Sequence, residues 1–261
     1  MKGPLHFITA LDPAHYENDA MKVVQGILLE TQAKLKEHLI APDLPSEHRM
    51  WEYGMGLLST LSVNTLRRVL EVGGSNSLFL PTLASFNKRT RKGTVLYDAL
   101  ETKEWATPEN VSWQKRQMEV IDPEVRFLQW DLPSQPDAEF DFVACISVIE
   151  HEVEEENLIR SLAHFVAPGG VLYLTSDFGE KEPDTYHFSW MRERIYTPAS
   201  WKRLVEKFAF LSLFPVEGEL PPDYEWKGAH VYGSYNFACM TLQRRALEPK
   251  ILCSSKERKE K

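Results

Sequence analysis

Arg68-Val69-Leu70-Glu71-Val72-Gly73-Gly74-Ser75-Asn76-Ser77 is the stretch that decides the fold. Its apolar residues are typical of a short buried strand, its two glycines permit a tight turn, and Ser77 can cap a following helix. Such a turn leaves backbone N–H groups free at the start of the helix, and Glu71 is placed to accept hydrogen bonds from a ligand. An ordinary strand-to-helix junction also fits these ten residues, so the stretch alone leaves both interpretations open.

Composition limits the class of protein. The chain has 261 residues, 43% of them hydrophobic, which is enough to bury the core of one large domain. Its formal net charge of −8 disfavours binding to nucleic acid through phosphate groups. No apolar run approaches the roughly 20 residues of a membrane span, and the N-terminus lacks the features of a secretory signal. The three cysteines have neither disulfide-framework nor zinc-site spacing, so we expect a cytoplasmic protein without a metal site.

Two amphipathic helices are expected before the glycine turn. Apolar residues recur at helical spacing between His15 and Leu39, and again from about Ser46 to Leu61. We expect residues 1–65 to form a helical cap over the strand, turn and helix that follow. The second helix carries Trp51, Glu52 and Tyr53 before the turn, and these are candidate ligand-binding residues, although aromatic residues on a helix also fit a place in the core.

After Arg68, strand-like runs alternate with helical patterns. This alternation predicts a parallel sheet with helices on both faces. Two further runs, Leu211–Pro215 and Tyr235–Gln243, follow each other without a helix, so we expect an antiparallel hairpin at the edge of the sheet. We expect a loop and an irregular helix from Glu101 to Glu124, and a flexible tail over residues 246–261. The first five runs are Arg68–Val72, Thr94–Tyr97, Val125–Trp130, Phe142–Ile146 and Val171–Thr175.

Acidic residues follow two of these runs. Asp98 lies one helix and one strand beyond the glycine turn, at the predicted end of the second strand. A carboxylate there can accept hydrogen bonds from a ribose diol. Asp131 and Leu132 follow the third strand, where the acid can accept from an exocyclic amine while apolar side chains pack on an aromatic base. Either aspartate alone would also fit an ordinary turn.

In their order and spacing, these motifs resemble those of the class I S-adenosylmethionine-dependent methyltransferases. The resemblance covers Arg68 to Gln243 and implies a methyltransferase domain over residues 66–245. It implies a Rossmann-like, mostly parallel seven-stranded sheet with helices on both faces and an antiparallel C-terminal edge strand. The chain departs from the family where Ser75 and Ser77 replace glycines in the turn. The residues that carry it are Glu71-Val72-Gly73-Gly74, Asp98, Asp131, Phe140-Asp141-Phe142-Val143, Ser147-Val148-Ile149-Glu150-His151 and Pro168-Gly169-Gly170-Val171-Leu172-Tyr173-Leu174-Thr175.

The resemblance implies S-adenosyl-L-methionine as the cofactor and a role for several residues in holding it. The sulfonium already makes the methyl group electrophilic, so direct SN2 transfer needs mainly an aligned nucleophile. The implied binding residues are Glu71, Gly73 and Gly74 with Ser75 for the methionine part, Asp98 for the ribose, Asp131 and Leu132 for the adenine, and Ser147 near the sulfonium.

Two histidines are candidate general bases, because imidazole titrates near neutral pH. His151 belongs to the motif after the fourth strand, where a structural role is the alternative. His187 lies in a stretch from Glu182 to Tyr196 that concentrates His, Arg and aromatic residues beyond the fifth strand. We expect that stretch to border the acceptor pocket, because ligands of open α/β sheets bind at the carboxyl ends of the strands.

The acceptor class is less constrained. An Asn/Asp-Pro-Pro-Tyr/Trp motif, which favours methylation of nucleic-acid bases or glutamine, is missing after the fourth strand. A small-molecule acceptor with an O or N nucleophile is therefore favoured. The alternative is a degenerate fold that binds the cofactor or a partner protein without turnover, which the replaced glycines leave open.

Overall fold

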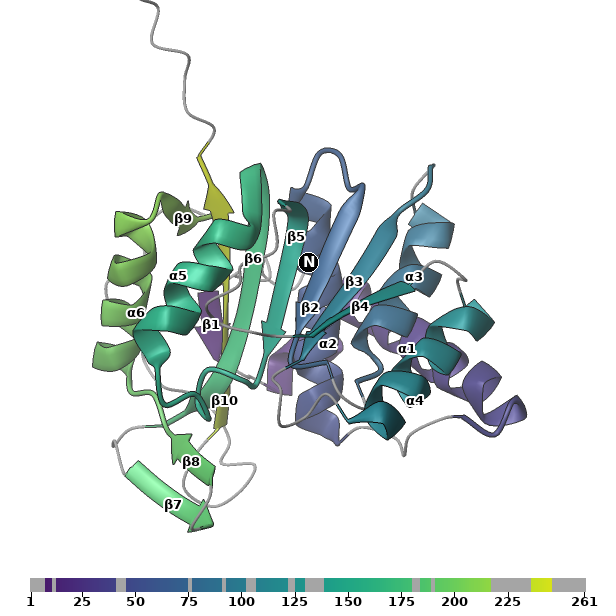
Figure 1. The fold of residues 1–261 in the computed structure, drawn as a ribbon, viewed down its shortest axis with the longest axis horizontal. Coiled ribbons are helices and arrows are strands. Elements are labelled where there is room, and N and C mark those ends of the chain that lie inside the picture. Colours follow the sequence, from purple (N-terminus) through teal and green to yellow (C-terminus); the bar gives the residue numbers. More distant parts are fainter. Residues whose placement is uncertain are drawn as a thin grey trace, which may run out of the picture.

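One eight-stranded sheet organises the described part of the chain (Figure 1). Its strand order is β1-β10-β6-β5-β2-β3-β4, and β9 also pairs with β10. The structure is a computed structural model. It describes residues 8–10, 13–40, 46–74, 77–90, 93–101, 107–121, 125–129, 139–179, 184–188, 191–216 and 236–245.

The central strands are parallel, as predicted, and the last strands are antiparallel. The expected number of seven strands is wrong, since β1 adds an eighth among the described residues. β1 also pairs with β10, so β10 is not the edge strand that was expected. The parallel strands are β2 (Arg68–Val72), β3 (Leu96–Glu101), β4 (Val125–Gln129), β5 (Phe140–Ile146) and β6 (Val166–Phe178). The antiparallel strands are β1 (Ile8–Ala10), β9 (Leu213–Pro215) and β10 (Asn236–Arg244).

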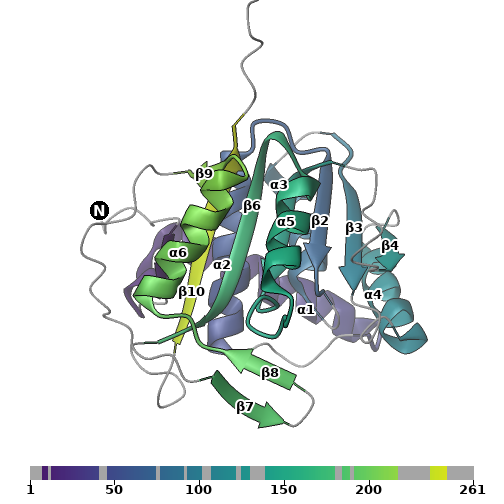
Figure 2. The same cartoon turned by 60° about the vertical axis from the view of Figure 1, so that its left-hand side comes forward.

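Helices cover both faces of the sheet, and Figure 2 shows α5 and α6 in front of it with α1 and α2 behind. Alternate side chains of the strands divide into two cores: Phe142 and Ala144 of β5 face one, while Val143 and Cys145 face the other. The first core includes α1 (Asp19–Glu37), α2 (Glu47–Ser59), α3 (Phe79–Thr90) and α4 (Pro108–Ile121). The second includes α5 (Glu155–Phe165) and α6 (Pro198–Phe210).

The two N-terminal helices pack into the same core as the sheet. Trp51 and Met55 of α2 are fully buried, in one cluster with Tyr173 of β6 and Cys239 of β10. This packing gives α2 a fixed place against the strands that carry the site described below. The division of the chain at residues 65 and 245 stays a prediction, and residues 246–261 lie outside the described residues.

Two segments differ from the sequence prediction. α4 is a regular helix in place of the expected loop and irregular helix, because Gln114, Gln117, Met118 and Ile121 bury one side of it at helical spacing. Between β6 and α6, the chain forms a hairpin of β7 (Asp184–Phe188) and β8 (Met191–Arg194). The hairpin lies beyond the carboxyl ends of the parallel strands (Figure 2), where the acceptor-binding stretch was expected.

Candidate functional site

The glycine turn after β2 has the predicted tight geometry. Gly73 has a φ of +75°, and its N–H donates to the carbonyl of Leu100 on β3 at 2.8 Å. A Cβ atom at Gly73 would lie 2.2 Å from Cγ2 of Val148, so glycine is required both by conformation and by space. Ser77 caps α3 as predicted, because its Oγ accepts from the N–H of Phe79 at 2.9 Å. Ser75 lies outside the described residues.

Glu71 and Gln114 flank Gly74 from two different elements, β2 and α4. A Cβ atom at Gly74 would lie 2.7 Å from Oε2 of Glu71 and 2.8 Å from Nε2 of Gln114. Both atoms are buried, and neither has a hydrogen-bond partner among the described residues. Burial raises the pKa of Glu71 to about 8, and a hydrogen bond from Ser77 limits the rise. A buried acceptor and a buried donor left open around one point are the features of a polar ligand site.

Tyr53 of α2 lies over this turn, as its position before the turn predicted. Its hydroxyl accepts a hydrogen bond from Oγ of Ser77 at 3.4 Å, and its ring packs on Phe79 with centroids 6.0 Å apart. Burial raises the pKa of Tyr53, so the hydroxyl stays neutral. The role of Tyr53 in ligand binding stays a prediction.

Asp98 does not lie at the end of a strand, and that part of the sequence prediction is wrong. β3 continues to Glu101, because the residues after Asp98 remain paired with β2 and β4. Asp98 is fully buried within the ladder, with Oδ2 3.2 Å from Nη2 of Arg68. The strand rises about 3.3 Å per residue, so Glu101 lies roughly 10 Å closer to the carboxyl edge. Glu101 is therefore the acid beside the turn, next to the carbonyl of Leu100 that holds Gly73.

A second buried polar group joins α2 to the ends of β5 and β6. Glu52 is fully buried, and its Oε1 accepts from the hydroxyls of Ser147 at 2.8 Å and Thr175 at 2.5 Å. Its Oε2 pairs with Nη1 of Arg49 at 2.9 Å, while its backbone carbonyl accepts from the hydroxyl of Tyr173 at 2.7 Å. Every oxygen of Glu52 is thus engaged, which fixes α2 against both strands.

Ser147, which directly follows β5, has a left-handed backbone with a φ of +49°. A non-glycine residue held in this region marks a locally strained segment. Glu150, three residues on, is 1% exposed, and its Oε2 has no hydrogen-bond partner among the described residues. Burial raises the pKa of Glu150 to about 8, although Arg49 opposes the rise. Burial lowers the pKa of Arg49, but the neighbouring acids, Glu52 foremost, outweigh that effect and keep it charged.

The remaining predicted residues are placed less fully. His151 lies half-buried in the turn after β5, where its backbone N–H donates to the carbonyl of Val148 at 3.0 Å. His187 belongs to β7, but its side chain is not among those described. Asp131 and Leu132 lie outside the described residues. The catalytic roles of both histidines and the adenine-binding roles stay predictions.

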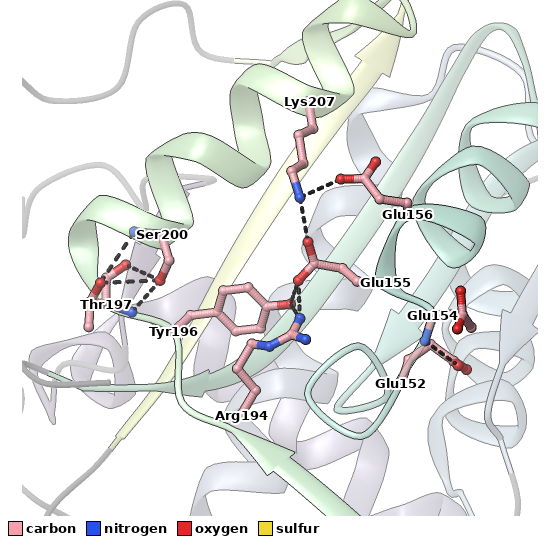
Figure 3. Close-up of polar contacts among 9 residues, drawn as sticks. All are labelled: Glu152, Glu154, Glu155, Glu156, Arg194, Tyr196, Thr197, Ser200 and Lys207. Atoms are coloured by element: carbon pink, nitrogen blue, oxygen red, sulfur yellow. Dashed lines mark hydrogen bonds and ion pairs between the residues drawn. The ribbon is translucent and has the colours of Figure 1, made fainter. Parts of the chain in front are cut away.

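An ion-pair network ties the hairpin to α5 and α6 (Figure 3). Glu155 accepts from the hydroxyl of Tyr196 at 2.8 Å and from Nζ of Lys207 at 2.6 Å, and it pairs with Arg194. Partial burial raises the pKa of Glu155, but the hydrogen bonds from Lys207 and Tyr196 outweigh this effect and lower it overall. The backbone N–H of Arg194 donates to the carbonyl of Glu150 at 2.9 Å, so the network also holds the segment that carries Glu150.

Sequence reasoning missed three polar residues of this region. Arg49 gave a usable signal, because it is a charged residue close to the apolar side of an amphipathic helix. Gln114 gave a similar signal on α4, but the helix itself was not expected to be regular. Glu101 was missed because the strand was predicted to end too early.

Three other features bear on the kind of site. Among the described residues, no group of three or more His, Cys, Asp or Glu side chains is arranged to hold a metal ion. None of the helices in the described ranges has the length and apolar character needed to cross a membrane. A pocket of about 590 Å³ lies on α4 between Pro108 and Arg116, and none of the predicted site residues that the structure describes lines it.

Residues 39–211 match a family described as "Methyltransferase domain". No protein of curated function matches the sequence. The N-terminal domain of EvdMO1 with S-adenosylhomocysteine (SAH) bound has 15% identity and a TM-score of 0.54, covering 87% of this chain and 100% of that chain. The 1,6-didemethyltoxoflavin-N1-methyltransferase of Burkholderia thailandensis, bound to 1,6-didemethyltoxoflavin and SAH, has 12% identity and a TM-score of 0.54, covering 91% and 95%.

The [4+2]-cyclase SpnF also has a similar structure, with 15% identity and a TM-score of 0.51 over 88% of this chain and 98% of that chain. At these identities, the structural likenesses establish the fold. The family match spans more than half of the chain and establishes the family. The chain therefore belongs to the methyltransferase family, as an enzyme of the class I S-adenosylmethionine-dependent type.

Proposed function

We propose that this methyltransferase binds S-adenosylmethionine at the turn after β2 and directs its methyl group to an O or N atom of a small molecule. The observation that carries the proposal is the open pair around Gly74, formed by Oε2 of Glu71 and Nε2 of Gln114. The amino group of the methionine part can donate to the first atom, and its carboxylate can accept from the second. This complementarity satisfies two buried groups that the described protein atoms leave open.

With the cofactor placed at this turn, roles follow for several other residues. Glu101 replaces Asp98 in the proposal as the ribose acceptor, because Glu101 is the acid beside the glycine turn. Ser147 borders the sulfonium, and Tyr53 shields the turn from water. The roles of Ser75, Asp131 and Leu132 are carried over from the family resemblance. When bound, the cofactor supplies an electrophilic methyl group, so these residues chiefly bind, orient and exclude water.

The acceptor side is assigned to the carboxyl ends of β5 and β6 and to the hairpin that covers them. A small-molecule acceptor is supported by the net charge of −8, which disfavours a nucleic acid. It is also supported by the small heterocycle bound to the toxoflavin methyltransferase, a structural relative. His187 and His151 are the candidate bases for an acceptor that must lose a proton.

Calorimetric titration with SAH tests the cofactor site. The variant Gly74→Ala places a methyl group between Glu71 and Gln114, and we expect it to weaken SAH binding about tenfold or more. Gly26→Ala is the matched control, because a Cβ atom there meets nothing within 4 Å on α1. Equal affinities for the wild type and Gly74→Ala would contradict the placement of the ligand.

Mass spectrometry separates catalysis from binding alone. The full chain is incubated with S-adenosylmethionine and a metabolite extract, and formation of SAH is compared with a reaction lacking the extract. We expect SAH and one methylated metabolite to accumulate together. Cofactor binding without either product would favour the alternative of a degenerate, non-catalytic chain.

A further inference from the structure

Three buried acidic side chains lie around one guanidinium where α2 meets the ends of β5 and β6. Arg49 interacts electrostatically with Glu52, Glu150 and Asp177. Glu52 and Glu150 are 0% and 1% exposed, and Asp177 is 4% exposed. A carboxyl group buried to this degree is stable only when its oxygens have hydrogen-bonding or ionic partners.

Within this cluster, the two glutamates differ in how their oxygens are used. Glu52 accepts from Ser147, Thr175 and Arg49, so each of its two side-chain oxygens already has a partner. Glu150 has one buried oxygen, Oε2, without a hydrogen-bond partner among the described residues. A buried carboxylate oxygen without a hydrogen bond carries a desolvation penalty, and a ligand that donates a hydrogen bond to it removes that penalty.

The place of Glu150 in the fold indicates which ligand would reach it. Glu150 interacts with Ser147, the residue that directly follows β5 and that the proposed function puts beside the sulfonium. Its backbone carbonyl holds Arg194 of the hairpin proposed to cover the acceptor. Glu150 is thus between the proposed position of the transferable methyl group and the acceptor hairpin.

We propose that Glu150, positioned by Arg49 and Glu52, forms a subsite for an amine, and that the methyl acceptor of this enzyme is an amine nitrogen. The inference rests on the proposed function and narrows its acceptor class. An anionic acceptor is excluded from this subsite, since it would add negative charge to three acids. In this role, Glu150 contacts the acceptor, whereas Glu52 and Arg49 are positioning residues.

The transfer to an amine balances in protons and electrons. The lone pair of the neutral amine forms the new N–C bond, while the electron pair of the C–S bond stays on sulfur. Before the transfer, the carboxyl of Glu150 releases its proton to solvent, which a pKa of about 8 permits near neutral pH. The methylated nitrogen then carries a positive charge, and its proton passes to the ionised carboxylate of Glu150. Glu150 and the nitrogen end as neutral groups, which suits a buried site.

Sinefungin, a cofactor analogue with an amine at the position of the transferable methyl group, tests the subsite without knowledge of the acceptor. We compare the dissociation constants of sinefungin and SAH by calorimetry on the full chain. We expect the wild type to bind sinefungin about tenfold or more tightly than SAH, because the ammonium donates to Glu150. In Glu150→Gln, this preference should fall to about onefold, while the SAH constant changes less than about threefold.

Glu154→Gln is the matched control, because it makes the same change on the same segment at an exposed side chain. It should keep the wild-type preference for sinefungin. Glu150→Asp, which retains the charge on a shorter side chain, should restore part of the preference and provides a second measurement where Glu150→Gln folds poorly.

An undiminished preference in Glu150→Gln, or no preference in the wild type, would overturn the amine subsite while SAH binding leaves the proposed function standing. Failure of the wild type to bind either compound would instead contradict the proposed function, and the subsite with it.

Discussion

Glu150 and Glu155 lie five residues apart, yet their carboxylates have opposite surroundings. Glu155 accepts from Lys207, Tyr196 and Arg194, and its pKa is lowered overall. Glu150 is more deeply buried, one of its oxygens is open, and burial raises its pKa to about 8. Glu71 beside the glycine turn shares the second pattern. The contrast separates an acid whose partners hold the fold together from acids with an open oxygen, for which we propose a ligand as the partner.

The largest effect is expected from Gly73→Ala, which alters the turn that the open acids border. A φ of +75° and a Cβ atom 2.2 Å from Val148 predict a loss of about 3–5 kcal/mol in the free energy of unfolding. Urea denaturation measures it. Gly169→Ala is the control, because Gly169 has a φ of +80° but open space around its Cβ position. Equal losses in both variants would mean that backbone strain, and not the close approach of Val148, accounts for the effect.

The second-largest effect is expected from Glu71→Gln, on the pH dependence of the free energy of unfolding. The folded carboxyl keeps its proton up to about pH 8, whereas the unfolded one loses it near 4.5. Folding therefore takes up a proton in this window, and the wild type loses stability as the pH rises, by up to about 1.4 kcal/mol per pH unit. Glu71→Gln has no carboxyl to titrate at this position. We therefore expect the free energy of unfolding of the variant, relative to that of the wild type, to rise by about 2–3 kcal/mol between pH 5.5 and 8. Parallel stability curves for the two proteins would contradict the raised pKa.

Glu155→Gln tests the opposite side of the comparison. Removing the charge that Arg194 and Lys207 share should lower the free energy of unfolding by about 1–2 kcal/mol at pH 7. Because the folded pKa of Glu155 is lowered, its contribution is present above the unfolded pKa near 4.5 and is lost as the pH falls through the folded value. The difference between the two proteins should therefore shrink below about pH 4.5. Thermal unfolding over this range measures it.

The control for this variant is Glu156→Gln, since Glu156 also pairs with Lys207 but has a side chain that is 60% exposed. We expect almost no change in its unfolding temperature. If Glu156→Gln is as unstable as Glu155→Gln, the loss of a negative charge near Lys207 accounts for the effect, and the specific bonds of Glu155 to Arg194, Tyr196 and Lys207 do not.

The smallest effect is expected from Ser77→Ala, at the residue that joins the glycine turn to α3. Loss of the cap on Phe79 should cost about 1 kcal/mol in the free energy of unfolding. Ser77→Thr keeps the hydroxyl and should retain most of the stability. Hydrogen exchange at the first turn of α3 locates the change, and unaltered exchange in Ser77→Ala would contradict the capping role.

The sequence by itself determined the alternation of strands and helices, the glycine turn with its cap at Ser77, and the place of Glu71. These features are local, because strand and helix periodicity, turn conformation and capping depend on residues close together in the chain. Local signals failed where a neighbouring element extended the ladder, and β3 therefore carries its terminal acid at Glu101 instead of Asp98.

Only the tertiary structure decided which polar groups meet at the site. Glu52 accepts hydrogen bonds from Ser147 and Thr175 across 95 and 123 residues of chain, and Gln114 reaches Gly74 from a helix expected to be irregular. These contacts depend on how α2 and α4 pack on the sheet. The same packing determines which buried carboxylate oxygens have a hydrogen-bond partner among the described residues and which do not. No local pattern encodes that distinction, because it arises from the summed desolvation and hydrogen bonding of segments far apart in sequence.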